Sequence, residues 1–147
     1  MQANDREAIA DLAKHYARCV DLRDFTLLPS LFMPAAKIIV GSANAAGAHE
    51  VWYRMDGIDQ ISAGLRQIVI YPITFHCLGQ QLVLESDADS ARTETYCTAY
   101  HYYQKDNAEI EYIMFIRYVD DLVRNSGRWQ FGQRRLLVQH TRGIPAA

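Results

Sequence analysis

Residues 92–103 (RTETYCTAYHYY) and residues 110–123 (IEYIMFIRYVDDLV) decide the fold. Both are long runs rich in β-branched and aromatic residues, as β-strands are. Similar runs cover 74–85 and 128–139. Turn-forming residues separate the four runs: Ser86-Asp87, Lys105-Asp106-Asn107 and Asn125-Ser126-Gly127. Such short connections between long strands predict an antiparallel meander.

The residues before this sheet predict three helices and two short strands. A helix from Asn4 to near Leu22 has an apolar stripe at helical spacing and a polar opposite face. A second, short helix is capped by Asp24 or Thr26, two alternatives that the sequence leaves open, and ends at Pro34. Strands at 37–40 and 50–55 flank a loop at 41–48, and a third helix spans 58–68. The chain is therefore predicted to be one α+β domain over residues 1–147.

The composition of the 147-residue chain excludes several classes of protein. Hydrophobic residues make up 50% and charged residues 22%, as in ordinary globular domains. The net charge of −2 argues against nucleic-acid binding. We expect a cytoplasmic protein with no membrane association, because the N-terminus lacks an apolar leader, the apolar runs are short, and the three cysteines form no framework. No nucleotide-binding loop or familiar hydrolase motif is present.

Alternation along 92–103 divides its side chains between two faces of the sheet. One face holds small and mildly polar residues and His101, which is typical of a cavity wall. The other holds Tyr96, Tyr100 and Tyr102, part of a surplus of nine tyrosines over five phenylalanines. This tyrosine stripe indicates either a subunit interface or a surface covered by neighbouring loops, and the two remain equal alternatives.

Three kinds of polar residue stand where apolar ones are expected. Asp21 flanks the apolar stripe of the first helix, and His76 lies in a strand with few polar groups. Arg134 and Arg135 interrupt the last strand, so one of them must point inward and needs a carboxylate partner. Each alone is typical of a satisfied structural residue, but an acid, a base and a cation in one small domain favour a site.

These residues, taken in order, resemble the SnoaL-like division of the NTF2-like superfamily, which includes scytalone dehydratase, bile-acid dehydratases and a lindane dehydrochlorinase. The resemblance is carried by Tyr16 and Asp21 with the following LRDF, by FHCLGQ at 75–80, and by Trp129 followed by Arg134. Gln80 departs from the usual asparagine. The family fold implies a cone of curved antiparallel or mixed sheet, an α+β barrel, whose three helices enclose an apolar pocket.

The resemblance also implies roles for the matching residues. Asp21 orients His76, which is the general base, and Tyr16 polarises the substrate. Arg134 steadies developing or leaving negative charge, and His101 on the small-residue face could serve as a second histidine. Either His101 or Arg134 would help hydroxide to leave. No metal or cofactor is implied. An imidazole suits this chemistry because its ordinary pKa lies near neutrality.

The function expected from this resemblance is a cofactor-independent lyase, similar to a dehydratase, for a small apolar or aromatic cyclic substrate. An isomerase with the same base, a small-molecule-binding protein and a scaffold similar to a dioxygenase small subunit are the alternatives. The family implies a homo-oligomer, with a trimer preferred.

Overall fold

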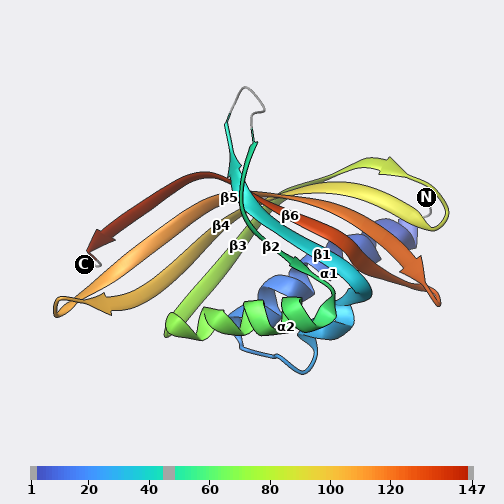
Figure 1. Cartoon of the computed structure of the whole chain (residues 1–147). Coiled ribbons are helices and arrows are strands. Elements are labelled where there is room, and N and C mark those ends of the chain that lie inside the picture. Colours follow the sequence, from blue (N-terminus) through green and yellow to red (C-terminus); the bar gives the residue numbers. More distant parts are fainter. Residues whose placement is uncertain (1–2, 45–48, 146–147) are drawn as a thin grey trace.

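A computed structural model describes residues 3–44 and 49–145 of the chain. Two α-helices and two 3₁₀ segments cover one face of a curved sheet (Figure 1). The helical elements are α1 (Ala3–Asp21), η1 (Leu28–Leu31), α2 (Ile58–Arg66) and η2 (Gln67–Ile70). The strands are β1 (Phe32–Ala43), β2 (His49–Asp56), β3 (Ile73–Ser86), β4 (Ser90–Lys105), β5 (Ala108–Asn125) and β6 (Arg128–Pro145).

The sheet has six strands in the order β2-β1-β6-β5-β4-β3. Strands β3 to β6 pair antiparallel in sequence order, so the predicted meander is confirmed. Strand β1 pairs parallel to β6, which makes the sheet mixed. Among the described residues β2 and β3 are not paired with each other, so the sheet is curved but open. The barrel that the family resemblance implies is therefore not closed, whereas the curved mixed sheet with helices on its concave side is present.

The expectation of three helices is also wrong within the described residues. The second predicted helix is the 3₁₀ segment η1, with Pro29 in its first turn. Asp24 does accept a hydrogen bond at this point, from the backbone N–H of Leu27 at 3.0 Å, but it closes a turn that precedes η1. The helix predicted over 58–68 is confirmed as α2, and its last turns tighten into η2 before Pro72.

Strand β1 begins earlier than predicted, at Phe32 and not at Lys37. It includes Pro34, which lacks the backbone N–H that a paired strand uses. The β1–β6 register shifts between Phe32 and Lys37, so Pro34 lies where the regular ladder is interrupted. The predicted loop at 41–48 is shorter, because β1 continues to Ala43; residues 45–48 lie outside the described part.

The core lies between α1 and the concave face of the sheet. The apolar stripe of α1 is buried there through Ile9, Leu12, Tyr16 and Val20, as its helical spacing predicts. Burial of apolar surface contributes roughly 25 cal/mol per Å² to stability, and this burial stabilises the packing of α1 against the sheet. The docking of α1 places its last residue, Asp21, beside β3, where Asp21 bonds His76.

Strand β4 divides its faces as the alternation predicts. Thr93, Thr95, Cys97, Ala99 and His101 are all buried on the concave side. On the convex side Tyr96 is 39% exposed, and the same face carries Phe75 at 62%, opposite Tyr100, and Phe115 at 39%, opposite Thr98. The single chain therefore has apolar side chains exposed on its convex surface. The described loops do not cover them. Within the described residues, no helix has the length and apolar character needed to cross a membrane.

Candidate functional site

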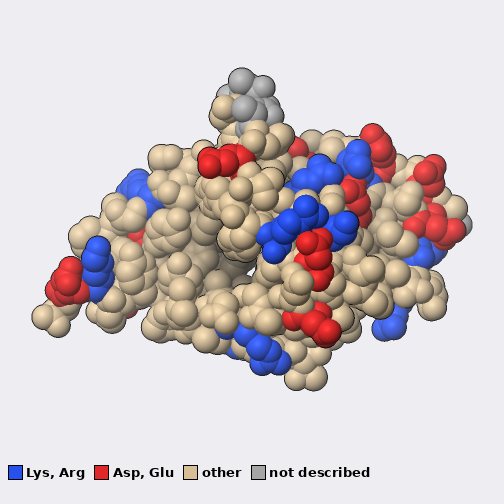
Figure 2. All heavy atoms as spheres, viewed as in Figure 1, with Lys and Arg blue, Asp and Glu red and all other residues tan. Residues whose placement is uncertain are grey.

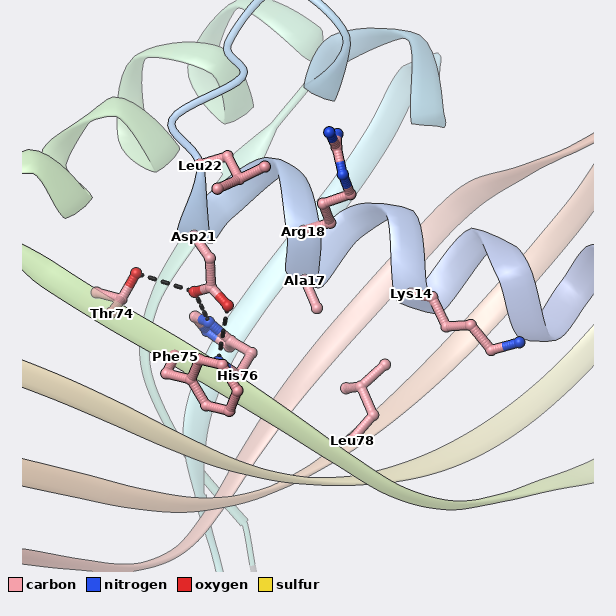
Figure 3. Close-up of a pocket in the computed structure, with 9 residues that line it drawn as sticks. All are labelled: Lys14, Ala17, Arg18, Asp21, Leu22, Thr74, Phe75, His76 and Leu78. Atoms are coloured by element: carbon pink, nitrogen blue, oxygen red, sulfur yellow. Dashed lines mark hydrogen bonds and ion pairs between the residues drawn. The ribbon is translucent and has the colours of Figure 1, made fainter.

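The last residue of α1 and the start of β3 form a tightly bonded acid–histidine pair (Figure 3). Asp21 Oδ1 lies 2.6 Å from His76 Nδ1, and Asp21 Oδ2 accepts the backbone N–H of His76 at 2.8 Å. Thr74 donates its hydroxyl to Asp21 Oδ1 at 2.9 Å. The side chains of His76 and Asp21 are only 6% and 17% exposed. The predicted contact is therefore present, and three donors fix the carboxylate.

These bonds determine which nitrogen of His76 is available for proton transfer. Burial alone raises the pKa of Asp21. The hydrogen bonds from the His76 ring, the His76 backbone and Thr74 lower it by more than burial raises it, so the pKa of Asp21 lies below its ordinary value. An ionised carboxylate only accepts hydrogen bonds, so neutral His76 carries its hydrogen on Nδ1. In that tautomer the other ring nitrogen, Nε2, carries no hydrogen and can accept one, and His76 is among the residues that line the internal cavity.

Asp21 is held in place because the helix ends there in a Schellman motif. The N–H of Asp24 bonds the carbonyl of Cys19 at 2.9 Å, and the N–H of Arg23 bonds the carbonyl of Val20 at 3.3 Å. Arg23 has φ 58°, the left-handed conformation that glycine usually supplies at this position. A non-glycine residue in this conformation costs on the order of 1 kcal/mol.

An internal cavity of about 190 Å³ lies between the concave sheet and α2. Figure 2 shows a hollow in the surface above α2 on this side of the molecule. Most of its wall is apolar, and the polar groups are His76, His101, Gln67 and three tyrosines. The predicted apolar pocket is therefore present. The remaining lining residues are Val20, Val40, Met55, Gly64, Leu65, Ile68, Met114, Ile116 and Leu136, and the tyrosines are Tyr16, Tyr53 and Tyr118.

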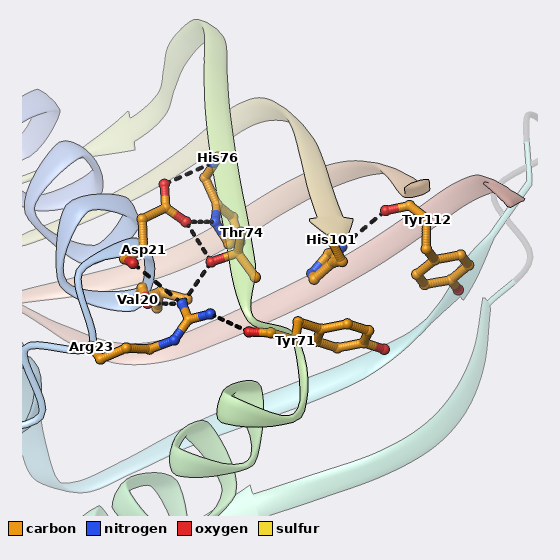
Figure 4. Close-up of polar contacts among 8 residues, drawn as sticks. All are labelled: Val20, Asp21, Arg23, Tyr71, Thr74, His76, His101 and Tyr112. Carbon is orange, nitrogen blue, oxygen red and sulfur yellow. Dashed lines mark hydrogen bonds and ion pairs between the residues drawn. The ribbon is translucent and has the colours of Figure 1, made fainter. Parts of the chain in front are cut away.

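His101 lies on β4 beside His76, and their ring centroids are 6.0 Å apart (Figure 4). Its Nδ1 is 3.2 Å from the carbonyl of Tyr112, which only accepts, so Nδ1 carries the hydrogen in the neutral ring. Burial and the neighbouring His76 lower the pKa of His101 to about 4. At neutral pH His101 is therefore neutral with an unprotonated Nε2, so it is an acceptor and not an acid.

Tyr16 belongs both to the cavity wall and to the core. It is 3% exposed and makes edge contacts with Phe32, Tyr118 and Phe131. Burial raises the pKa of Tyr16 to about 12, although the nearby Arg134 opposes that rise. Tyr16 therefore remains a protonated phenol at neutral pH and is suited to donate a hydrogen bond into the cavity.

Arg134 is the inward-pointing arginine, but it lies behind the cavity wall. It is fully buried and makes two bonds to Asp120, from Nε at 2.8 Å and Nη2 at 2.7 Å. Its guanidinium carbon lies 4.1 Å from the ring centroid of Tyr16. Burial alone lowers the pKa of Arg134, but Asp120 raises it above the ordinary value. Arg135 points outward and is 40% exposed. Arg134 is not among the cavity-lining residues, so direct contact with a ligand is not part of this arrangement.

A second, open groove reaches the acid–histidine pair from outside. It lies between α1 and β3 and has a volume of about 490 Å³ (Figure 3). Lys14 and Arg18 line it from α1, and Phe75 and Leu78 line it from β3. Asp21 and His76 are part of its wall. The pair therefore stands between the internal cavity and an outer groove.

Sequence reasoning missed three residues that complete these arrangements: Thr74, Arg23 and Asp120. Asp120 had a legible signal, because it stands on the same face of its strand as the apolar Ile116 and Leu122. Thr74 and Arg23 had none, since their importance depends on the packing of α1 against β3. No group of three or more His, Cys, Asp and Glu side chains in the described ranges is arranged to hold a metal ion.

Comparison with solved structures supports the fold. A candidate scytalone dehydratase from Novosphingobium aromaticivorans has a TM-score of 0.79 and 20% identity, over 97% of this chain and 89% of that one. The hexachlorocyclohexane dehydrochlorinase LinA-type3 from Novosphingobium barchaimii has a TM-score of 0.78 and 17% identity, over 98% and 92%.

The β subunit of a candidate aromatic-ring-hydroxylating dioxygenase from Novosphingobium aromaticivorans has a TM-score of 0.73 and 18% identity, over 92% and 90% of the two chains. At these identities the likeness establishes the fold and not the activity. A comparison with curated proteins found no match. The model of the SnoaL-like domain matches residues 1–135. The chain thus belongs to the SnoaL-like family of NTF2-like domains.

Proposed function

We propose that the protein is a cofactor-independent lyase that removes water from a small cyclic hydroxy ketone. The observation that carries this proposal is the Asp21–His76 pair, with its 2.6 Å contact, in the wall of an apolar cavity. Asp21 engages Nδ1 of the His76 ring, which leaves Nε2 as the nitrogen available to a ligand in the cavity that His76 lines. A purely binding or scaffolding domain has no need of such a base.

In the proposed reaction, His76 Nε2 takes a proton from the carbon next to the substrate carbonyl. The electrons of that C–H bond move toward the carbonyl, and the phenol of Tyr16 donates a hydrogen bond to the oxygen as its negative charge grows. The enolate then forms the C=C bond and expels hydroxide from the next carbon. His76, now an imidazolium stabilised by Asp21, returns its proton to the leaving oxygen, so that water departs.

This assignment changes the role expected for His101. With a pKa of about 4 it is neutral at pH 7 and has no proton to give to hydroxide. We assign it the binding of the substrate hydroxyl, whose O–H it accepts at Nε2. His76 then acts first as base and afterwards as acid, which requires that the proton and the hydroxide leave from the same face of the ring.

Arg134 contributes to this site through Tyr16 and not by touching substrate. Its charge lies 4.1 Å from the Tyr16 ring and makes that phenol a better hydrogen-bond donor. The volume of 190 Å³ is below the ~300–1,000 Å³ of sites for drug-sized ligands. The cavity suits a ligand of one ring or two fused rings with few polar groups. The Nε2 atoms of His76 and His101 can accept hydrogen bonds from such a ligand, and the phenol of Tyr16 can donate one.

The decisive test is turnover of a panel of cyclic β-hydroxy ketones, followed by the ultraviolet absorbance of the enone product. We expect the wild type to form enone and His76→Ala to lose roughly 10²–10⁴-fold in kcat while it keeps its circular dichroism and Tm. His15→Gln is the matched control, since His15 is exposed on α1. An active His76→Ala variant would overturn the mechanism. A shifted double bond without loss of water would indicate an isomerase, and binding without conversion would indicate a scaffold.

We also propose that the convex face joins copies of the chain, as a trimer. Support comes from its exposed apolar side chains, among them Ile73 at 57% and Phe75 at 62%, next to the tyrosines of β4. An apolar patch of this kind is unusual on a monomer. Light scattering after gel filtration should give three times the 16.8 kDa chain mass, and Phe75→Glu should dissociate it. A monomeric wild type would contradict the proposal.

A further inference from the structure

We propose that Arg23 is a positioning residue that fixes the direction of the hydrogen bonds through Asp21 to His76. This inference rests on the proposed function only for its kinetic part, because its main consequence concerns the free enzyme. In the sequence, Arg23 is distinguished only as a member of the LRDF segment. The structure places it where three segments of the site meet (Figure 4).

The guanidinium of Arg23 makes three close bonds, each to a different part of the site. Nη1 donates to the carbonyl of Val20 at 2.6 Å and to the hydroxyl of Thr74 at 2.7 Å. Nη2 donates to the carbonyl of Tyr71 at 2.7 Å. Arg23 thereby ties the end of α1 to the residues that lead into β3, across about fifty residues of sequence.

The chemistry of these groups leaves a single arrangement of hydrogens. A guanidinium only donates, so the Thr74 hydroxyl must accept from Arg23. The hydroxyl proton is then free to point only at Asp21 Oδ1, 2.9 Å away, which as a carboxylate only accepts. The same oxygen takes the hydrogen of His76 Nδ1. The chain therefore runs from Arg23 through Thr74 to Asp21, and it keeps the His76 hydrogen on Nδ1.

The backbone of Arg23 supports a role for its side chain. A glycine would adopt φ 58° at this helix end without strain, so the turn itself does not require arginine. The bonds made by the guanidinium offset the strain of the backbone. Arg23→Gly therefore removes the guanidinium bonds without adding backbone strain, because glycine adopts the left-handed conformation readily.

A second connection runs from Arg23 toward the other histidine. The carbonyl that Nη2 holds belongs to Tyr71, whose ring centroid is 4.8 Å from that of His101. Arg23 thus restrains the His76 ring through Thr74 and Asp21, and the His101 ring through Tyr71. Arg23 itself does not line the cavity.

The test compares Arg23→Gly, Thr74→Val and Thr74→Ser with wild type by ¹⁵N NMR of the ring nitrogens of His76 in the absence of substrate. We expect wild type to show one tautomer, with hydrogen on Nδ1. In Arg23→Gly and Thr74→Val the two nitrogen shifts should move toward each other, because Asp21 is less constrained. Thr74→Ser keeps the hydroxyl and should restore the wild-type spectrum. Arg18→Gln, the loss of an exposed charge in the outer groove, is the charge-matched control.

The kinetic readout is kept separate from the spectrum. If the proposed reaction is found, Arg23→Gly and Thr74→Val should lower kcat by roughly 10–100-fold with little change in KM. Should Arg23→Gly fold poorly, Thr74→Val tests the same chain with Arg23 in place. An unchanged His76 spectrum in the variants would overturn the inference even in an active enzyme. An inactive wild type with the expected spectra would instead overturn only the proposed function.

Discussion

The concave side of the sheet holds two acid–base pairs with opposite characters. Asp120 and Arg134 are 1% and 0% exposed and are sealed behind aromatic rings. Asp21 and His76 are also well bonded, but they line both the cavity and the outer groove. The first pair joins a carboxyl whose pKa is raised by burial to an arginine whose pKa is raised by that carboxyl. The second contains a histidine, the side-chain type that enzymes use most often for proton transfer. The first pair is therefore buried without access to either space, whereas the second is open to both, and only the second could meet a ligand.

The largest expected effect comes from breaking the sealed pair. Asp120→Ala leaves the Arg134 charge buried without its partner, which should cost about 3–5 kcal/mol of unfolding free energy. Urea unfolding of the variant and wild type measures this loss. Asp121→Ala is the matched control, because it removes the next carboxylate along β5, which is 34% exposed, and should cost much less. Equal losses would contradict the distinction between the pairs.

A second prediction concerns the pH dependence of the unfolding free energy, which we expect to come from His101 in the cavity and not from the Asp120–Arg134 pair. The pKa of His101 is about 4 in the folded state and about 6.5 when unfolded, so between these values the unfolded chain binds more protons. Stability should therefore fall by about 3 kcal/mol as the pH drops from 6.5 to 4. Asp21, whose pKa is lowered, contributes only at more acidic pH.

Urea unfolding at several pH values measures this slope. We expect His101→Phe to flatten it and His15→Gln, at an exposed position, to leave it unchanged. If His101→Phe kept the wild-type slope, the pH dependence would have to come from other groups, and the neutral state assigned to His101 would be wrong.

The smallest effect is expected at Tyr16, which connects the two pairs. Tyr16→Phe keeps a ring over the Arg134 guanidinium but removes the phenolic hydroxyl from a residue that lines the cavity. We expect little change in Tm and a fall in kcat of roughly 10-fold, or ~1.4 kcal/mol in the barrier. Steady-state kinetics and thermal unfolding measure the two quantities. A large loss of stability with unchanged kcat would place Tyr16 with the sealed pair alone.

Sequence alone predicts those features that local pattern determines. The spacing of α1 indicates its buried stripe, and alternation along β4 separates His101 from the outward tyrosines. Asp21 and His76 draw attention because their polarity conflicts with apolar surroundings. Their contact, 55 residues apart in the chain, was expected from the family resemblance and not from either segment.

What the sequence does not reveal depends on tertiary packing. The 3₁₀ form of η1 and the early start of β1 follow from how these segments meet β6, whose backbone pairs with Phe32. The partner of Arg134 could be found only once Asp120 and Arg134 were known to stand opposite each other on β5 and β6. The role of Arg23 required the positions of Val20, Tyr71 and Thr74 together.

The parallel pairing of β1 with β6 determines the order in which parts of the sheet can fold during synthesis. Ile38 pairs with Arg134, almost a hundred residues later, and β6 separates β1 from the rest of the sheet. During synthesis β1 has only β2 as a paired neighbour in the sheet until β6 has left the ribosome. The cavity therefore cannot form before the last strand is made, and such long-range pairing slows folding. A chain cut short within β6 would lose the strand that joins both halves of the sheet.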